Sequence, residues 1–268
     1  MVQRWAWPTP SEVGLRALRP EPSTPHRLNR RDITAAEFSE TYLQPMLLAI
    51  DHIVLPVADL ALAAAEIETR HGLISVEGGR HPAWGTANRI IPLGDTYVEL
   101  VAVADSETAA QTAFGRWVAT STPGRPLGWA IRTDAIDAVG RRLGLPIVPG
   151  ARVAPGGALL TWSSAGIEVA TREPGLPFFI QWGDGVPLPG AAPVPHPGGP
   201  ARLTLLLLTG DPTRLAGWLG EHDLPIALAT GPSGVSAVVL TQRHRDFELR
   251  ASGVGAEHVQ TSSDIRAR

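Results

Sequence analysis

One pattern occurs three times along this chain of 268 residues: an apolar strand, a capping Asp or Thr, a helix and a break. The strands span residues 50–57, 127–132 and 203–208, and the helices begin at Asp59, Thr133-Asp134 and Asp211-Pro212. Asp and Thr side chains accept hydrogen bonds from the free N–H groups of a first helical turn, and Pro favours the first helical position. The leucines that follow the helices, Leu73, Leu145 and Leu224, are 72 and 79 residues apart. This period is too long for a solenoid and fits a module of about one helix and four strands.

Further strands can be placed inside each copy. Residues 87–93 and 96–103 flank Gly94-Asp95, which is a hairpin signal. The second copy offers strands at 158–163, 167–171 and 178–182, and the third at 235–241 and 247–250. The sequence therefore predicts an α+β fold of repeated βαβββ modules, with two paired modules and a third partial module.

The segments between and around these modules differ in composition. Residues 1–45 are rich in Pro and Arg without periodicity, which predicts a poorly ordered extension. Met46 is the second of only two methionines, so a true start at Met46 stays open. The predicted divisions are a body of two βαβββ modules at 46–184, a Pro/Gly linker at 185–200, a third module at 201–252 and a flexible tail at 253–268. Because strand 203–208 is apolar on both faces, we expect the third module to pack on the others.

Composition excludes several classes of function. The net charge of −3 and the lack of a basic run argue against nucleic acid and anionic membrane partners. No apolar run approaches the ~20 residues that span a bilayer, and no secretory signal is recognisable. The absence of cysteine excludes disulfides and thiolate catalysis. We expect a cytoplasmic protein that binds a small molecule, with a homodimer as the candidate assembly.

Two titratable side chains interrupt apolar strands. His52 lies in the strand 50–57 and Glu99 in the strand 96–103. Leaving either group buried and unpaired would be costly, so each needs a partner, a wet cavity or a metal. Two structural alternatives stay open: His52 satisfied by its neighbour Asp51, and Glu99 paired with Arg89 across the hairpin. By strand alternation Glu99 can equally face a shared pocket with His52.

The repeated units, together with four short motifs, resemble the vicinal oxygen chelate superfamily and its glyoxalase-like branch. The motifs are residues 48–54, 78–88, 93–100 and 177–182. The likeness covers residues 46–182 well and 202–250 loosely. It implies two modules that enclose a cavity between curled sheets.

The resemblance also implies a divalent metal held by the first and fourth strands of both modules. His52, Glu99 and Gln181 match three of the four ligand positions, and the fourth falls near Leu127 or Gly128, which cannot bind through a side chain. Imidazole and carboxylate ligands suit Fe, Mn, Zn or Ni. The implied function is a metal-dependent isomerase, lyase or dioxygenase acting on an oxygen-rich substrate. The incomplete ligand set favours the alternative, a non-enzymatic module that sequesters a small ligand.

Other residues are candidates for substrate contact. His81 lies beside the glycines of 78–88 and can bind substrate, supply the missing imidazole ligand or simply be an exposed loop histidine. Glu99 or His81 is the candidate catalytic residue that moves a proton. Arg80 can hold a carboxylate in bidentate fashion. Thr86 and Asn88 share one strand face and can bond a substrate oxygen. Four aromatic residues can line a pocket or belong to an ordinary core: Trp129, Trp162, Phe179 and Trp182.

Overall fold

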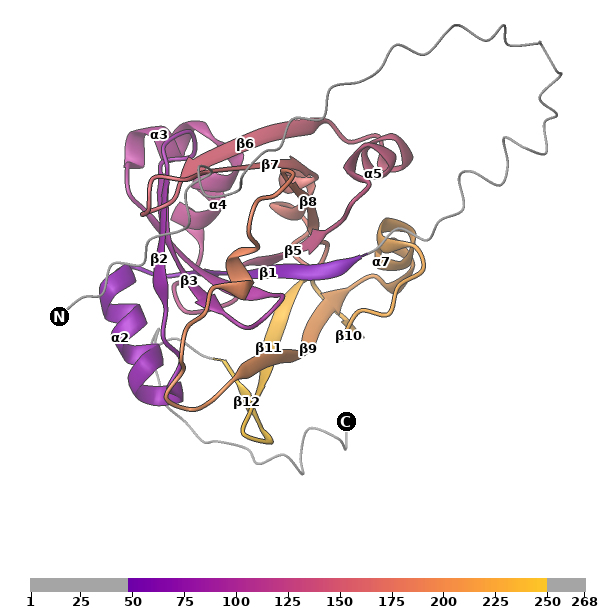
Figure 1. Cartoon of the computed structure of the whole chain (residues 1–268). Coiled ribbons are helices and arrows are strands. Elements are labelled where there is room, and N and C mark those ends of the chain that lie inside the picture. The colour runs from indigo at the N-terminus through magenta and orange to yellow at the C-terminus, as the bar shows by residue number, and fades with distance from the viewer. Residues whose placement is uncertain (1–47, 250–268) are drawn as a thin grey trace, which may run out of the picture.

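The computed structural model of the chain describes residues 48–249. The predictions for residues 1–45, for a start at Met46 and for the tail 253–268 lie outside the described residues. Within the described range the three units follow one another along the chain, and each begins with a strand followed by a helix (Figure 1).

The first unit contains one helix and four strands. They are β1 (Ala49–Pro56), α2 (Leu60–His71), β2 (Val76–His81), β3 (Thr86–Pro92) and β4 (Tyr97–Val103). Asp59 begins α2, because its carboxylate accepts hydrogen bonds from the N–H groups of Ala61 and Leu62 at 2.8 and 2.9 Å. Gly72 ends the helix with φ 62°, a left-handed conformation that glycine adopts without a steric cost. The start and stop signals in the sequence thus set the length of α2.

The second unit repeats this order with one addition. Its elements are β5 (Gly128–Arg132), α5 (Ile136–Leu143), β6 (Ile147–Val153), β7 (Leu159–Ala165), α6 (Ile167–Ala170) and β8 (Phe178–Trp182). The strand predicted at 167–171 is wrong, since these residues form the short helix α6. Gly166 turns the chain after β7 with φ 88°. The second unit already has four strands without this segment, because β6 pairs with β7 as one of them.

Strands β1 to β8 form a single sheet in the order β2-β3-β4-β1-β5-β8-β7-β6. In each unit the first strand pairs in parallel with the last, β1 with β4 and β5 with β8. The units join where β1 and β5 pair antiparallel. The edge strands β2 and β6 also contact each other, so the sheet curls almost closed around a concave face. This is the α+β arrangement of paired βαβββ modules that the sequence predicts.

Two helices that the sequence analysis did not identify cover part of the concave face. They are α3 (Ser106–Gln111) and α4 (Ala113–Thr120). Phe114, Trp117 and Val118 of α4 pack with Val54 and other concave-facing side chains in one apolar cluster. In Figure 1 these helices lie on the opposite side of β1 from the orange and yellow strands of the third unit.

The third unit keeps the order of elements but not the arrangement of strands. It consists of β9 (Ala201–Gly210), α7 (Pro212–Leu219), β10 (Ile226–Thr230), β11 (Gly234–Gln242) and β12 (Arg245–Glu248). Its sheet has the order β10-β9-β11-β12, so the first strand pairs with the second and third rather than with the last. Leu206 and Leu208 are buried, whereas Leu205 and Leu207 on the other face are only half-buried. One face of β9 is therefore buried and the other is only partly covered, which is less burial than the apolar character of both faces predicts.

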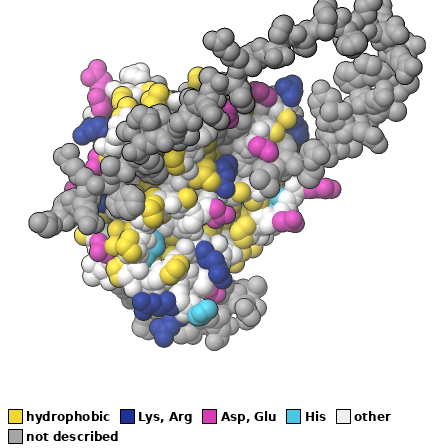
Figure 2. Space-filling model, viewed as in Figure 1, with side chains coloured by type: hydrophobic (Ala, Val, Ile, Leu, Met, Phe, Trp, Pro, Cys, Tyr) yellow, Lys and Arg dark blue, Asp and Glu magenta, His cyan; other side chains and the backbone are white. Residues whose placement is uncertain are grey.

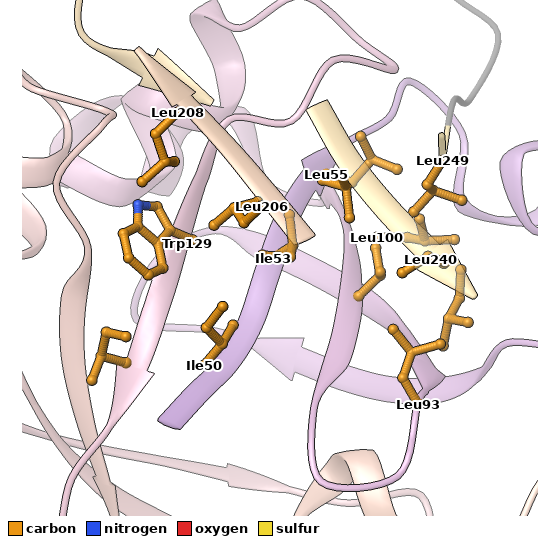
Figure 3. Close-up of a cluster of buried hydrophobic side chains, with 14 of the residues drawn as sticks. Ile50, Ile53, Leu55, Leu93, Leu100, Trp129, Leu206, Leu208, Leu240 and Leu249 are labelled. Atoms are coloured by element: carbon orange, nitrogen blue, oxygen red, sulfur yellow. The ribbon is translucent and has the colours of Figure 1, made fainter. Parts of the chain in front are cut away.

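The main core lies between the convex face of the large sheet and the third unit. Ile53 and Leu55 of β1 and Trp129 of β5 are buried against Leu206 and Leu208 of β9 (Figure 3). Leu240 and Leu249 extend the same cluster toward Leu100. Burying a leucine fully contributes about 1.5–3 kcal/mol relative to leaving it exposed. The third unit therefore acts as a cover for the convex face.

The Pro/Gly-rich segment between the second and third units is bonded to the first unit. It contains the short 3₁₀ helix η2 (Pro189–Ala191). His196 accepts a hydrogen bond from the N–H of Ile74 at 3.0 Å, and its Nε2 lies 2.7 Å from the carbonyl oxygen of Pro92. This one histidine connects the segment to both ends of the β2–β3 region.

The described surface carries both signs of charge. Acidic and basic side chains are interspersed between apolar patches on the face seen in Figure 2. Within residues 48–249, no helix is long and apolar enough to cross a membrane.

Candidate functional site

Strand alternation places His52 and Glu99 on the same face of the large sheet. β1 and β4 are parallel neighbours, with His52 opposite Tyr97 and Val54 opposite Glu99. Side chains two residues apart along a strand point to the same side. Tyr97 and Glu99 therefore join His52 on the concave face, while Ile53 lies in the convex core.

A cavity of about 30 Å³ lies on this concave face. Its polar lining comes from both modules: His52, His81, Asn88, Glu99, Arg152 and Ser164. Its apolar lining is mostly aromatic: Trp84, Phe114, Trp162, Phe178 and Trp182. A water molecule needs about 10–15 Å³ of such space, so the cavity has room for roughly two water-sized groups.

Asp51 organises one wall of the cavity. The register of β1 against β5 shifts between Ile50 and His52, which makes Asp51 the extra residue of a β-bulge. A bulge re-aims side chains, and here the carboxylate of Asp51, 1% exposed, meets the side chain of His52. It also accepts hydrogen bonds from Trp182 Nε1 at 2.9 Å and from Arg132 at 3.4 Å. Asp51 thus joins the two modules beneath the cavity.

The contact with Asp51 fixes how His52 presents its ring. His52 Nδ1 lies 2.7 Å from Asp51 Oδ1, and an ionised carboxylate can only accept, so Nδ1 carries the proton. The other ring nitrogen, Nε2, lies 3.8 Å from Glu99 Oε2. Tyr97 stacks on the ring at a centroid distance of 4.7 Å. Of the two alternatives for His52, the bond to Asp51 is present, and it directs Nε2 into the cavity.

Glu99 is held by an amide and not by an arginine. Asn88 Nδ2 donates to Glu99 Oε1 at 2.5 Å. Arg89, the alternative partner from the sequence analysis, instead bonds Ser75 through Nε at 2.9 Å. One carboxylate oxygen of Glu99 is therefore anchored, and the other faces His52.

Burial changes the acid–base behaviour of two further cavity groups. Desolvation raises the pKa of Tyr97 well above its usual value, and the nearby charges of Asp51 and Glu99 raise it further. Desolvation lowers the pKa of His81, against the opposing charge of Glu99. Both side chains are therefore neutral at neutral pH. His81 is buried, with Nδ1 3.1 Å from Thr86 Oγ1 across the β2–β3 pair.

Arg152 is a cavity residue that the sequence analysis missed. It comes from β6, at the far edge of the large sheet, and reaches in beside Gly79 of β2. Burial lowers the pKa of Arg152, while Tyr97 and Glu99 raise it. In the structure Gly150, two residues before Arg152, packs against the indole of Trp162, so both residues face inward, but no pattern in the sequence of this strand indicates it.

The four aromatic candidates divide between the two faces. Trp162 and Trp182 line the cavity, 5.7 Å apart in an edge-to-face contact. Trp129 and Phe179 lie in the convex core, where Trp129 Nε1 donates to Gly175 and Phe179 packs 6.1 Å from Trp218. The structure therefore does not bring Trp129 and Phe179 to the cavity.

The remaining predicted residues have different positions. Asn88 lines the cavity, and Thr86 reaches it through His81. Arg80 is exposed and lies outside the cavity lining. Gln181 also lies outside it, because its Oε1 accepts the backbone N–H of Ile136 at 2.9 Å and so caps α5. Thr133 does not cap the N–H of Ile136, because its hydroxyl accepts a hydrogen bond from the N–H of Ala135 instead.

These donors do not fit a catalytic metal site of the expected kind. Such a site needs about three protein ligands and an open position. Residues 48–249 contain no group of three or more His, Asp or Glu side chains placed to hold one ion. His52 Nε2 and Glu99 Oε2 lie 3.8 Å apart and supply two ligands, while Nδ1 of His52 is bonded to Asp51 and Asn88 points its amide nitrogen at Glu99. The second module contributes the cation Arg152 to the same cavity.

Comparison with known proteins identifies the fold of this site. A family model described as a glyoxalase-like domain matches residues 50–222. No curated protein matches the chain. A hypothetical protein from Staphylococcus aureus is similar in structure, with a TM-score of 0.56, 16% identity and coverage of 72% of this chain and 91% of that one.

Two similar structures are epimerases. Methylmalonyl-CoA epimerase from Mycobacterium tuberculosis has a TM-score of 0.39 and 20% identity, covering 54% of this chain and 93% of that one. A Streptomyces coelicolor methylmalonyl-CoA epimerase in complex with 2-nitronate-propionyl-CoA has a TM-score of 0.36 and 17% identity, covering 50% and 95%. At these identities the likeness concerns the fold alone.

Proposed function

We propose a function that starts from one fact: the chain belongs to the glyoxalase-like domain family of the vicinal oxygen chelate superfamily. The proposed protein is an enzyme that moves a proton on a small, oxygen-rich substrate in the concave cavity. One observation carries this proposal. Glu99 is a buried carboxylate with one oxygen anchored by Asn88 and the other directed at His52 Nε2.

Glu99 is the proposed proton-accepting group. Its anchored oxygen keeps the side chain in one orientation, and its Oε2 borders the cavity where a substrate C–H or O–H can approach. A positioned general base typically contributes 10²–10⁴-fold to a rate. This is the chemistry of isomerases and lyases, which need a base, an acid and a stabilised oxygen.

The two histidines are the proposed partners of Glu99. His52 presents Nε2 to the cavity because Asp51 holds Nδ1. Glu99, once protonated, is the acid that returns the proton to the substrate. His81 is neutral at neutral pH because burial lowers its pKa, so it acts as a hydrogen-bonding group toward the substrate and not as a cation. Trp84 and Trp162, whose ring centroids lie 6.1 Å apart, limit the access of water to these groups.

The metal-dependent form of the hypothesis has less support. A divalent ion would polarise a substrate oxygen, but its three protein ligands are not assembled among residues 48–249. Dioxygenase chemistry depends most on such an ion, so the proposal is restricted to proton transfer. It includes a cytoplasmic location, which cell fractionation tests, and a homodimer, which size-exclusion chromatography of the native chain tests.

A second candidate is a binding module without turnover. The observation that favours it is the small cavity, about 30 Å³, between aromatic walls and an incomplete ligand set. Such a module would hold a ligand by stacking on Trp162 and Trp182 without abstracting a proton.

Hydrogen exchange in D₂O separates these functions. The native chain is incubated with a panel of small 2-oxo and 2-hydroxy compounds, and loss of the C–H signal beside the carbonyl or hydroxyl is followed by NMR. We expect exchange that survives EDTA and falls at least about 100-fold in Glu99→Gln. Binding without exchange supports the second candidate. Exchange that EDTA abolishes restores the metal-dependent hypothesis.

A further inference from the structure

Arg152 is a buried cation without a bonded partner. Its side chain is 6% exposed and lines the cavity. Within residues 48–249 its guanidinium makes no hydrogen bond or ion pair, and it senses Tyr97 and Glu99 only through their charge. A buried charge without a partner is costly. A bound ligand is therefore the partner to look for, because the free protein does not supply one.

The surroundings of Arg152 are shaped to admit it. Gly79 has φ 135°, and a Cβ there would lie 3.2 Å from a terminal nitrogen of Arg152 and 3.1 Å from the carbonyl oxygen of Val153. Any side chain at residue 79 would therefore press on the guanidinium. Gly150, on the same strand as Arg152, would place a Cβ 2.3 Å from the ring of Trp162. Two glycines thus keep this part of the cavity clear for a long side chain.

No carboxylate of the cavity neutralises Arg152 directly. Glu99 is bonded to Asn88 and faces His52. Asp51 is bonded to His52, Trp182 and Arg132. The positive charge of Arg152 is therefore available to an incoming anion.

The charge and the geometry of Arg152 suit one kind of anion. Arginine presents a planar fork of donors that fits the two oxygens of a carboxylate. A cavity of about 30 Å³ has room for roughly two water-sized groups, which is the space that two carboxylate oxygens need. A phosphate carries about −1.5 to −2 charges at neutral pH, more than the single cation Arg152 offsets beside the carboxylate of Glu99.

We propose that the substrate is a small carboxylic acid whose carboxylate is bound by Arg152 in bidentate fashion. This inference rests on the proposed function, because it deepens the description of the same cavity. The second module then supplies the substrate anchor, and the first module supplies the base Glu99. Arg152 fulfils the need for a positive charge in the cavity that the resemblance assigns to a metal ion.

The test compares carboxylates with neutral molecules: acetamide has the shape of acetate without its charge, and acetone keeps the methyl ketone of pyruvate without its carboxylate. Pyruvate and acetate are the probes, and acetone and acetamide are their neutral counterparts. Binding is followed by the fluorescence of the cavity tryptophans and by the ¹⁵N NMR signal of Arg152 Nε. Hydrogen bonds to charged groups contribute about 1.5–3 kcal/mol, which is roughly a 10–150-fold change in affinity. We expect pyruvate to bind at least 10-fold more tightly than acetone.

Variants of Arg152 locate the effect. Arg152→Gln should weaken pyruvate binding at least 10-fold. The affinity of Arg152→Lys for pyruvate should lie between those of the native chain and Arg152→Gln, because lysine keeps the charge but lacks the planar fork of donors. Arg142→Gln is the matched control, since Arg142 bonds the carbonyls of Gly217 and Trp218 away from the cavity. It should bind pyruvate like the native chain. Equal binding of pyruvate and acetone by the native chain, or unchanged pyruvate binding by Arg152→Gln, overturns the proposal.

Two further comparisons keep the outcomes distinct. If Arg152→Gln does not fold, the comparison of pyruvate with acetone on the native chain still shows whether the cavity prefers a carboxylate. Glu99→Gln should bind pyruvate while losing hydrogen exchange. If the native chain binds carboxylates through Arg152 but exchanges no hydrogen, the carboxylate site stands and the proposed enzymatic function fails.

Discussion

The two faces of the eight-stranded sheet are built from alternate residues of the same strands, yet they have opposite characters. On β8, Phe178, Ile180 and Trp182 border the cavity, whereas Phe179 and Gln181 face the convex side. On β1, His52 faces the cavity and Ile53 the core. The concave face holds charged and hydrogen-bonding groups, and the convex core is apolar and closed by the third unit.

Residues that serve function and residues that serve stability therefore alternate along each strand. A shift of one residue along a strand moves a side chain from one face to the other. A substitution on the convex face should therefore change the free energy of unfolding, and one on the concave face should mainly change binding or proton transfer.

Removal of the third unit should have the largest effect. A chain ending after Trp182 would uncover Ile53, Leu55 and Trp129 on the convex face. Each uncovered large side chain loses about 1.5–3 kcal/mol, and together the losses match a typical net stability of 5–15 kcal/mol. We expect an insoluble or unfolded product by circular dichroism and sedimentation. A soluble, folded monomer would show that the convex face needs no cover.

Two adjacent phenylalanines provide a matched pair. Phe179→Ala removes a fully buried ring that packs on Trp218, and should lower the free energy of unfolding by about 3–5 kcal/mol. Phe178→Ala opens space beside an existing cavity that water can enter, so we expect about half that loss. Urea denaturation of both variants is the measurement. Equal losses would remove the distinction between the two faces.

Gln181 tests the same division with a polar residue. Gln181→Ala removes the acceptor for the N–H of Ile136 at the start of α5. The loss of such a cap costs about 0.5–2 kcal/mol. Binding of pyruvate and of divalent metals should not change, because the side chain lies outside the cavity. A loss of metal binding in this variant would restore Gln181 as a ligand.

The sequence predicts the fold better than it predicts the site, and the reason is physical. Strand alternation and helix caps are local, so β1, α2 and β4 follow from residues near one another in the chain, whereas the shared face of His52 and Glu99 depends on how β1 pairs with β4. The face of the sheet on which Trp129 and Phe179 lie is not determined by residues near them in the chain. It depends on which face of the assembled sheet meets the third unit, and both faces accept aromatic side chains.

Arg152 shows the limit most clearly. In β6 the apolar Val148 and Val153 are exposed and Arg152 is buried, the reverse of the usual pattern. The space that Arg152 fills is made by Gly79, on a strand that pairs with β3 and meets β6 only through closure of the sheet. The bulge at Asp51 and the strand order of the third unit are likewise products of pairing. Chain-local patterns do not contain these contacts.

The smallest predicted effect concerns the stability of the concave face in mild acid. Burial lowers the pKa of His81 below the value near 6.5 that it has in an unfolded chain. Below pH 6.5 the unfolded chain therefore binds a proton that the folded chain resists, and the free energy of unfolding falls as the pH falls. Above that pH the contribution is fully present. In His81→Gln, urea denaturation between pH 7.5 and 5.0 should show a shallower loss than in the native chain. Equal slopes would mean that water reaches His81 freely, and that the cavity is wetter than its aromatic walls suggest.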